Sequence, residues 1–214
     1  MTNFTEGQHP GEFIVSVANG KRSFDDTTVL SGETLKAGHV VGKAYLGAGS
    51  SVADVGNTGD GAMGAITVGG NAQVGDYVLT VTEAATNAGA FQVVDPQGDV
   101  VGVGTVGQAF SGGGLSFTLA DGAADFAVGD FFTLTVAAGS DKYREWNPAN
   151  TDGSQVAAGI LFDAVDASAA DADGVRISRD AEVNEDELVY FTGATADDKA
   201  AAQVDLDSRG IIYR

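Results

Sequence analysis

Hydrophobic and polar residues alternate along much of the middle of the chain, and this alternation predicts β-strands. Between residues 76 and 82, large apolar side chains occupy every second position: Tyr77, Leu79 and Val81. Because successive side chains of a strand point to opposite faces, a period of two indicates a half-buried strand. Residues 115–119 and 131–136 show the same alternation. We expect one strand in each of these three segments.

A hairpin is predicted over residues 90–110. An apolar run at residues 91–94 leads into Asp95-Pro96-Gln97-Gly98, and a second apolar run returns over residues 100–106. Proline at the second position of a type I turn presets φ, and aspartate at the first position can bond the backbone ahead of it. Several short strands joined by such turns, with no helical period between them, predict a small antiparallel β-sandwich or barrel.

The two ends of the chain have a different pattern. Short apolar runs interrupted by glycine predict further, bent strands within residues 27–43, 155–165, 174–178, 187–191 and 211–213. Thr195 followed by two acidic residues is typical of a helix start, because a threonine side chain can cap the first turn and acids suit its positive end. The helix would place Ala196, Ala200 and Val204 on a thin apolar face.

Charge and glycine content change at the same two places. Residues 47–140 contain nine acidic residues, 20 of the 31 glycines and no Lys or Arg, so all 11 basic residues lie outside. A composition change at both ends of an internal segment is typical of an inserted domain, whose flanks fold together. We therefore expect one discontinuous domain from residues 1–46 and 141–214, and an inserted β-domain from residues 47–140. A single large β-domain with a glycine-rich half is the alternative.

The composition also excludes several classes of partner and site. A formal charge of −19 argues against nucleic acid and anionic membranes as partners. The absence of cysteine excludes disulfides, a thiolate nucleophile and cysteine-based metal sites. The sequence has no apolar run of about 18 residues, which predicts no transmembrane helix. Its first residues lack the pattern of a secretory signal.

Candidate chemistry is sparse. His9 and His39 could act as acids or bases, but neither lies in a nucleophile motif, so we expect structural roles. The acidic segments at residues 171–174 and 60–61 lack the ligand number and spacing of a calcium loop. Trp146, beside the second composition boundary, is either an interface anchor or a residue that packs at the junction. We expect no catalytic residue, no metal and no cofactor.

Several short blocks of the flanks follow one another in a characteristic order. They are Glu6-Gly7-Gln8-His9-Pro10-Gly11-Glu12-Phe13-Ile14-Val15-Ser16, residues 18–20, residues 28–43, residues 152–161, residues 179–183 and residues 210–211. In this order they resemble the head decoration proteins of lambda-like tailed bacteriophages. The resemblance covers residues 4–46 and 143–214, and the large insertion is absent from small members of that family.

The resemblance implies a mainly β protein. It would be a β-clip-like decoration domain with one short helix, interrupted by the inserted β-domain. It further implies a homotrimer that binds the major capsid protein on the outer face of the expanded capsid and stabilises it against the pressure of packaged DNA. The protein would be found in the host cytoplasm during assembly and then on the virion.

The resemblance also points to the N-terminal arm as the capsid contact. By their position in an arm of residues 1–13, Phe4, Thr5, His9 and Phe13 are the candidate capsid-binding residues. An extended segment of this kind can add a strand to an exposed sheet edge. Three arms on one trimer would make a weak contact avid.

Two other functions remain open at the level of sequence. A glycan- or receptor-binding module on the virion surface would rest on the inserted β-domain, with Tyr143 and Trp146 as the nearest candidate aromatics. The other function is a secreted-type hydrolase accessory domain or a hydrolase itself, which predicts an acid pair in a cleft. Because the sequence contains no nucleophile motif, we expect that the protein is not an enzyme.

Overall fold

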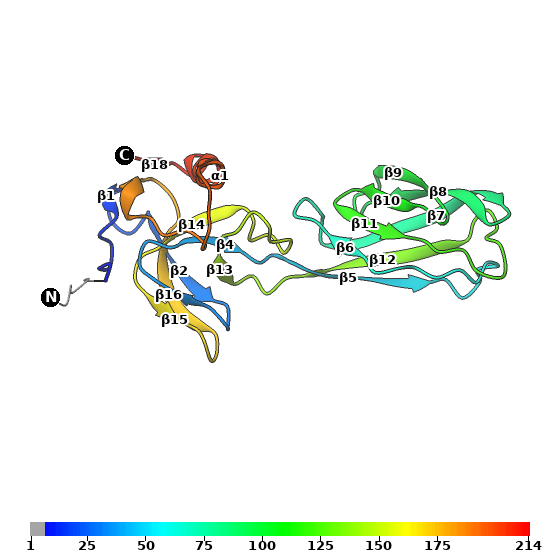
Figure 1. The fold of residues 1–214 in the computed structure, drawn as a ribbon, viewed down its shortest axis with the longest axis horizontal. Helices are drawn as coiled ribbons and strands as arrows, with labels where there is room; N and C mark the ends of the chain where they lie inside the picture. The colour runs from blue at the N-terminus through cyan, green and yellow to red at the C-terminus, as the bar shows by residue number, and fades with distance from the viewer. Residues whose placement is uncertain (1–6) are drawn as a thin grey trace. The chain divides into compact units, whose positions relative to one another are not determined.

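The chain forms two compact units in a computed structural model that describes residues 7–214 (Figure 1). The first unit combines Met1–Ala44 with Asp141–Arg214, and the second is Tyr45–Ser140. The composition changes at residues 47 and 140 lie close to the boundaries between the two units along the sequence. The protein is mainly β, as the alternation predicts, with a single α-helix among the described residues.

The first unit is built on a small closed barrel. Its strands, in order around the barrel, are β13 (Tyr143–Glu145), β2 (Phe24–Val29), β16 (Ala172–Ile177), β14 (Ala157–Leu161) and β4 (Val40–Lys43). All five residues of β14 are buried. Because a closed barrel has no unpaired sheet edge, this arrangement satisfies the backbone groups of these short strands.

Smaller elements surround the barrel. Strands β1 (Ile14–Val17), β17 (Ala181–Val183) and β18 (Ile211–Tyr213) form a three-stranded sheet, and β15 (Val165–Asp166) pairs with β3 (Thr34–Leu35). Helix α1 (Ala196–Asp207) begins at the predicted cap, where the Thr195 side chain accepts from the backbone N–H of Asp198 and the Asp198 side chain accepts from that of Thr195. This reciprocal pair satisfies two donors that the first turn leaves unpaired.

Two local predictions were wrong. The buried residues of α1 are Ala202 and Leu206, whereas Val204 is 69% exposed. Ala202 and Leu206 lie one turn apart and join the core that includes Ile211 of β18. Tertiary packing therefore buries a different face of the helix from the one that Ala196, Ala200 and Val204 form. The strand expected over residues 187–191 is reduced to one bridge between Val189 and His39. It is preceded by the 3-10 turn η1 (Glu185–Glu187).

The second unit is a sandwich of two sheets. The larger sheet has the strand order β5 (Leu46–Ala53), β12 (Phe131–Ala138), β7 (Gly75–Ala85), β8 (Ala88–Val94) and β9 (Val100–Thr105). The smaller sheet has the order β10 (Ala109–Gly112), β11 (Leu115–Thr118) and β6 (Thr67–Val68). One continuous core includes the predicted inward residues Tyr77, Leu79 and Val81 together with Phe110 and Phe117 of the smaller sheet.

The turn of the predicted hairpin has the expected chemistry. The N–H of Gly98 donates to the carbonyl of Asp95 at 3.0 Å. The Asp95 side chain accepts from the N–H groups of Gln97 and Asp99, at 3.0 and 2.9 Å. These bonds close the connection between β8 and β9 and confirm the prediction made from Asp-Pro-Gln-Gly.

The chain leaves and re-enters the first unit on adjacent segments. Tyr143 of β13 pairs antiparallel with Lys43 of β4. The N–H of Ala44 donates to the carbonyl of Lys142 at 2.9 Å, and the N–H of Asp141 donates to the carbonyl of Ala44 at 2.8 Å. The second unit is therefore connected to the first through one loop position, as an insertion requires.

Gly42 tests the barrel closure, because a side chain has no room there. A Cβ atom at Gly42 would lie 2.1 Å from the carbonyl oxygen of Ser154, which is itself fully buried. We expect Gly42→Ala to lower the free energy of unfolding by about 3 kcal/mol, since overpacking forces backbone shifts. Thermal and urea unfolding measure the loss. Gly7→Ala is the control, because a Cβ there meets nothing within 4 Å; an equal loss in both variants would contradict the explanation.

The division into units predicts that the first unit folds without the second. We expect a variant in which a short Gly-Ser linker replaces Tyr45–Ser140 to fold cooperatively, since Ala44 and Asp141 are already hydrogen-bonded. The isolated segment 45–140 should fold as well, because it has its own core. Circular dichroism during thermal unfolding measures both. A deletion variant without a cooperative transition would favour the single large β-domain instead.

Candidate functional site

The four candidate capsid-binding residues fall in different environments. Phe4 and Thr5 lie outside the described residues. His9 is exposed, and its backbone N–H donates to Glu12 Oε2 at 3.0 Å. Phe13 is 1% exposed and belongs to the core of the first unit. The position of Phe13 therefore assigns it a packing role and offers no surface for a capsid contact.

The segment before β1 is attached to the first unit. The Gln8 side chain donates to the carbonyl of Glu187 at 2.9 Å, and the N–H of Gly11 donates to the carbonyl of Phe162 at 2.9 Å. Gly11 has a φ of +69°, and a Cβ there would lie 2.6 Å from the Phe162 ring. The left-handed φ favours glycine at this turn, and a side chain there would have to displace the Phe162 ring. We call residues 8–13 the arm root, because this part of the expected arm is bound to the first unit.

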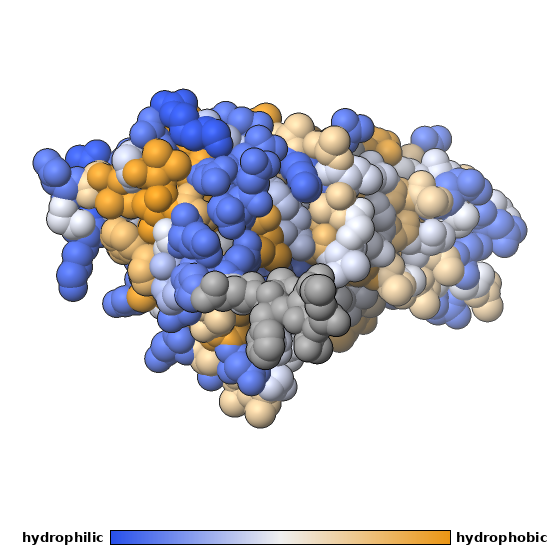
Figure 2. All heavy atoms as spheres, turned by 60° about the vertical axis from the view of Figure 1, so that its left-hand side comes forward, coloured by the Kyte–Doolittle hydropathy of each residue, from blue (hydrophilic) through white to orange (hydrophobic). Residues whose placement is uncertain are grey.

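The sheet that follows the arm root exposes apolar side chains. Val15 and Val17 of β1 are 55% and 39% exposed, and Ile212 of β18 is 42% exposed. Between these strands, Ser16 donates to the Glu182 carboxylate at 2.8 Å, and Arg214 forms an ion pair with the same group. Figure 2 shows hydrophobic residues that reach the surface in groups bordered by hydrophilic ones.

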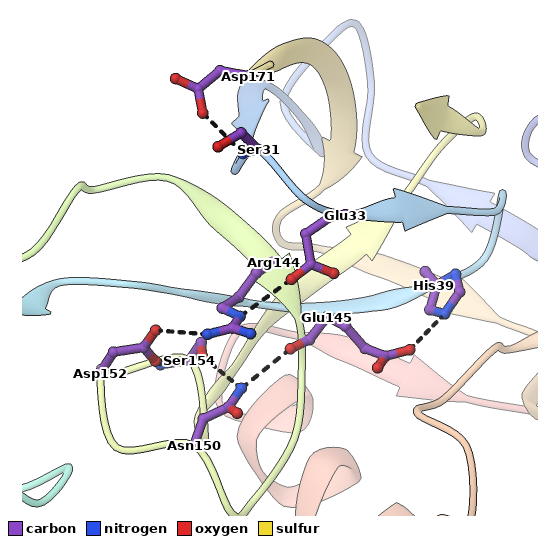
Figure 3. A network of polar contacts seen from close by, with 9 residues as sticks. All are labelled: Ser31, Glu33, His39, Arg144, Glu145, Asn150, Asp152, Ser154 and Asp171. Carbon is purple, nitrogen blue, oxygen red and sulfur yellow. Dashed lines mark hydrogen bonds and ion pairs between the residues drawn. The ribbon is translucent and has the colours of Figure 1, made fainter. Parts of the chain in front are cut away.

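A polar network holds the strand that returns from the second unit (Figure 3). Arg144 of β13 forms ion pairs with Glu33 and Asp152, each at 3.3 Å. The next residue, Glu145, accepts from His39 Nε2 at 3.1 Å. Adjacent residues of one short strand therefore reach three separate segments of the first unit.

The loop after β13 completes this network. Ser154 Oγ donates to Asp152 at 2.5 Å, and the Asn150 side chain donates to Ser154 Oγ at 2.7 Å. Burial opposes ionisation of Asp152. Hydrogen bonds from Ser154 and Arg144 outweigh that effect, so the Asp152 pKa lies below its ordinary value. The loop that covers Gly42 is consequently held by a charged residue as well as by packing.

His39 has both ring nitrogens engaged. Its Nδ1 accepts from the backbone N–H of Lys36 at 2.8 Å, so Nε2 carries the proton that is donated to Glu145. Burial lowers the pKa of His39, although Glu145 acts in the opposite direction. A neutral imidazole with two protein partners has no nitrogen left to activate a nucleophile. The geometry of His39 is structural, as the sequence predicts.

The aromatic residues near the second composition boundary belong to the first unit. Trp146 is 1% exposed, and its Nε1 donates to the carbonyl of Gln155 at 2.8 Å. The guanidinium of Arg176 lies over the ring of Tyr143, 4.4 Å from the ring centroid. The Trp146 ring is therefore buried, and Arg176 covers one face of the half-buried Tyr143 ring. The sequence pattern indicated Trp146 as a candidate contact, but it gave no signal for Arg144 and Glu145, the two charged residues that precede it.

Residues 7–214 contain neither a metal cluster nor a membrane-spanning helix. No group of three or more His, Cys, Asp or Glu side chains there could hold a metal ion. In the same part of the chain, no helix has the length and apolar character needed to span a membrane.

Comparison with known proteins gives one match that spans nearly the whole sequence. The family model described as bacteriophage lambda head decoration protein D matches residues 3–211, including the second unit. No curated protein matches the sequence.

Solved structures give only weak similarities. FlgL from Xanthomonas campestris is 21% identical over 49% of this chain and 34% of its own, with a TM-score of 0.34. The flagellar junction protein FlgL from Legionella pneumophila is 12% identical over 50% and 37%, with a TM-score of 0.35. The flagellar hook junction protein FlgK from Burkholderia pseudomallei is 23% identical over 61% and 23%, also with a TM-score of 0.35. The chain thus spans about a third or less of these proteins, and TM-scores this low do not establish a shared fold.

The environment of His39 predicts a pH-dependent stability. In the unfolded chain histidine has a pKa of about 6.5, and in the folded protein the pKa of His39 is lower. Below about pH 6.5 the unfolded chain therefore binds a proton that the folded chain resists, so the free energy of unfolding falls as the pH is lowered from 7.5 to 5.5. Urea unfolding across this range measures the slope.

His39→Gln isolates this contribution. The glutamine amide can accept from Lys36 and donate to Glu145 without titrating, so the variant should show a smaller slope between pH 7.5 and 5.5. The control His9→Gln leaves the contacts of His39 in place and should retain the slope of the unmodified protein. An unchanged slope in His39→Gln would show that other groups cause the pH dependence.

Proposed function

The chain belongs to the family of the bacteriophage lambda head decoration protein D, a family of structural phage proteins, and from this premise we propose that it binds the outer face of the expanded capsid as a homotrimer. In this role it stabilises the capsid against the pressure of packaged DNA. The family match over residues 3–211 carries the proposal. Its partner is the major capsid protein.

The arm root supports a contact made by the residues before it. Gln8, Gly11 and Phe13 attach the segment to the first unit. We propose that Phe4 and Thr5 lie in the part of the arm that pairs with the capsid lattice, and that His9 lies at its base.

Strand β1 offers a continuation of this contact. It is the edge strand of its sheet, which has the order β1-β17-β18, and it follows the arm root directly in sequence. An edge strand presents unpaired backbone groups to which another strand can add. Exposed Val15 and Val17 would supply apolar area beside those groups. Three copies on one trimer would turn weak single contacts into stable attachment.

The second unit has no part in the proposed capsid contact. It carries nine acidic residues and no basic residue, and such a charge is best kept in water, where repulsion is screened beyond about 8–10 Å. Its core is separate from the cores of the first unit. We propose that it projects into solvent from the decorated capsid.

Removal of residues 1–6 tests the capsid contact. The deletion stops before the arm root, so it spares Phe13, which a deletion through residue 13 would remove from the core. We expect the variant to keep the unfolding midpoint of the unmodified protein and to have the mass of three shortened chains in light scattering, as the unmodified protein should have three times 21.6 kDa. We also expect that it no longer cosediments with expanded capsids, because it lacks the segment proposed to add a strand to the capsid lattice.

The matched control is the variant in which a linker replaces Tyr45–Ser140. That variant should bind expanded capsids and raise their heat resistance as the full chain does. Full capsid occupancy by the protein without residues 1–6 would refute the arm contact. A monomeric mass for the unmodified protein, in solution and on capsids, would refute the trimer.

A further inference from the structure

We propose that the outer face of the five-stranded sheet in the second unit is a docking surface. Its partner is a protein whose contact surface has an apolar centre bordered by Lys or Arg. The proposal concerns residues 45–140 alone and does not depend on capsid binding.

The register of the sheet brings one row of side chains together across all five strands. Thr133 of β12 pairs with Val52 of β5 on one side and with Val78 of β7 on the other. Val78 pairs with Val94 of β8, and Val94 pairs with Val100 of β9. We call Val52, Thr133, Val78, Val94 and Val100 the valine row. With neighbouring strands about 4.8 Å apart, the row is about 19 Å long.

The valine row faces away from the core. Residues that alternate with it are the buried ones: Tyr77, Leu79, Val93, Phe132 and Leu134. In the row itself Val52 is 68% exposed, Val78 38% and Val100 58%. Val103, which pairs with Gln92 in the next row, is 68% exposed. The larger sheet, labelled by its strands in Figure 1, thus carries apolar side chains on both faces.

Strand propensity alone does not explain the row. An antiparallel sheet with one solvated face ordinarily places polar residues there. This sheet does so in the adjacent row, where Thr135 pairs with Ser50 and with Asp76. Threonine has a strand propensity like that of valine, and the outward positions of Thr80, Thr133 and Thr135 show that the sheet accepts it. Valine at four of the five positions in this row therefore provides apolar area that the fold does not need.

The charges at the border indicate what covers this face. Asp76 lies on it beside the row, where its carboxylate accepts from Thr135 Oγ1 at 2.6 Å. Asp54 follows the end of β5, and its N–H donates to the carbonyl of Phe131 at 3.1 Å. The second unit contains nine acidic residues and no Lys or Arg. A second copy would bring like charges together, whereas Lys or Arg on a partner would pair with them.

A designed probe tests the surface in the full-length protein. The probe is a β-hairpin peptide with valine on one face and lysine at the border of that face. The control peptide has glutamate in place of every lysine. Titration followed by NMR should show saturable shifts of amides in β5, β12, β7, β8 and β9 with the lysine hairpin. Binding should weaken as salt is raised, because border charges are screened. The glutamate hairpin should not bind.

Substitutions then localise the binding. Val78→Asn combined with Val100→Asn should lower the affinity for the lysine hairpin about tenfold, which is the usual effect of removing a central contact. Val128→Asn is the control, since Val128 is 64% exposed and lies outside the row. Asp54→Asn with Asp76→Asn leaves the row intact and should reduce the salt dependence. Thermal unfolding of each variant confirms that it is folded.

Several results would overturn the proposal. If the glutamate hairpin bound as tightly as the lysine hairpin, charge complementarity would not contribute to binding. Amide shifts confined to other strands would show that the contact lies elsewhere. An equal loss in Val128→Asn would show an unspecific effect. Concentration-dependent self-association that the Val78→Asn, Val100→Asn variant abolishes would identify a second copy of the chain as the occupant.

Discussion

The antiparallel pairing of β4 with β13 is the contact on which the architecture depends. These strands stand on either side of the second unit in sequence, and they neighbour each other in the closed barrel of the first. Gly42 of β4 pairs with Arg144 and lies under the backbone of Ser154, where no side chain fits. The pairing of β4 with β13 therefore holds the two ends of the 96-residue second unit next to each other. For this reason the barrel can carry a second folded unit without any change in its strand order.

Polar groups near this pairing determine how β13 is oriented. Arg144 and Glu145 reach Glu33, Asp152 and His39, so the strand is held by ion pairs and hydrogen bonds as well as by its backbone. Partly buried charges are tolerated only when they are paired, and breaking one pair leaves the other charge uncompensated. The network therefore favours one register of β13. The same unit provides the fixed base to which the arm root is attached.

Each of the two units carries a different set of exposed features. The first unit carries the arm root, the edge strand β1 and all basic residues. The second unit has a separate core, a strongly acidic surface and an apolar row on its outer face. Because the cores are distinct, a change to the outer face of the second unit does not alter the packing that holds the arm root. The proposed capsid contact and the proposed docking surface thus lie on different units of one chain.

The sequence alone determined the features that depend on neighbouring residues. Alternation at Tyr77, Leu79 and Val81 specified a strand and its buried face, Asp95 to Gly98 specified a turn, and Thr195 specified a helix start. Contacts between distant residues were decided only by the tertiary structure. His39 meets Glu145 across 106 residues, Phe13 is drawn into the core, and α1 buries Leu206 instead of Val204. The valine row likewise exists only through the register of five strands. Periodicity and turn chemistry act within a few residues, whereas register and packing depend on which segments come together, and no local pattern carries that information.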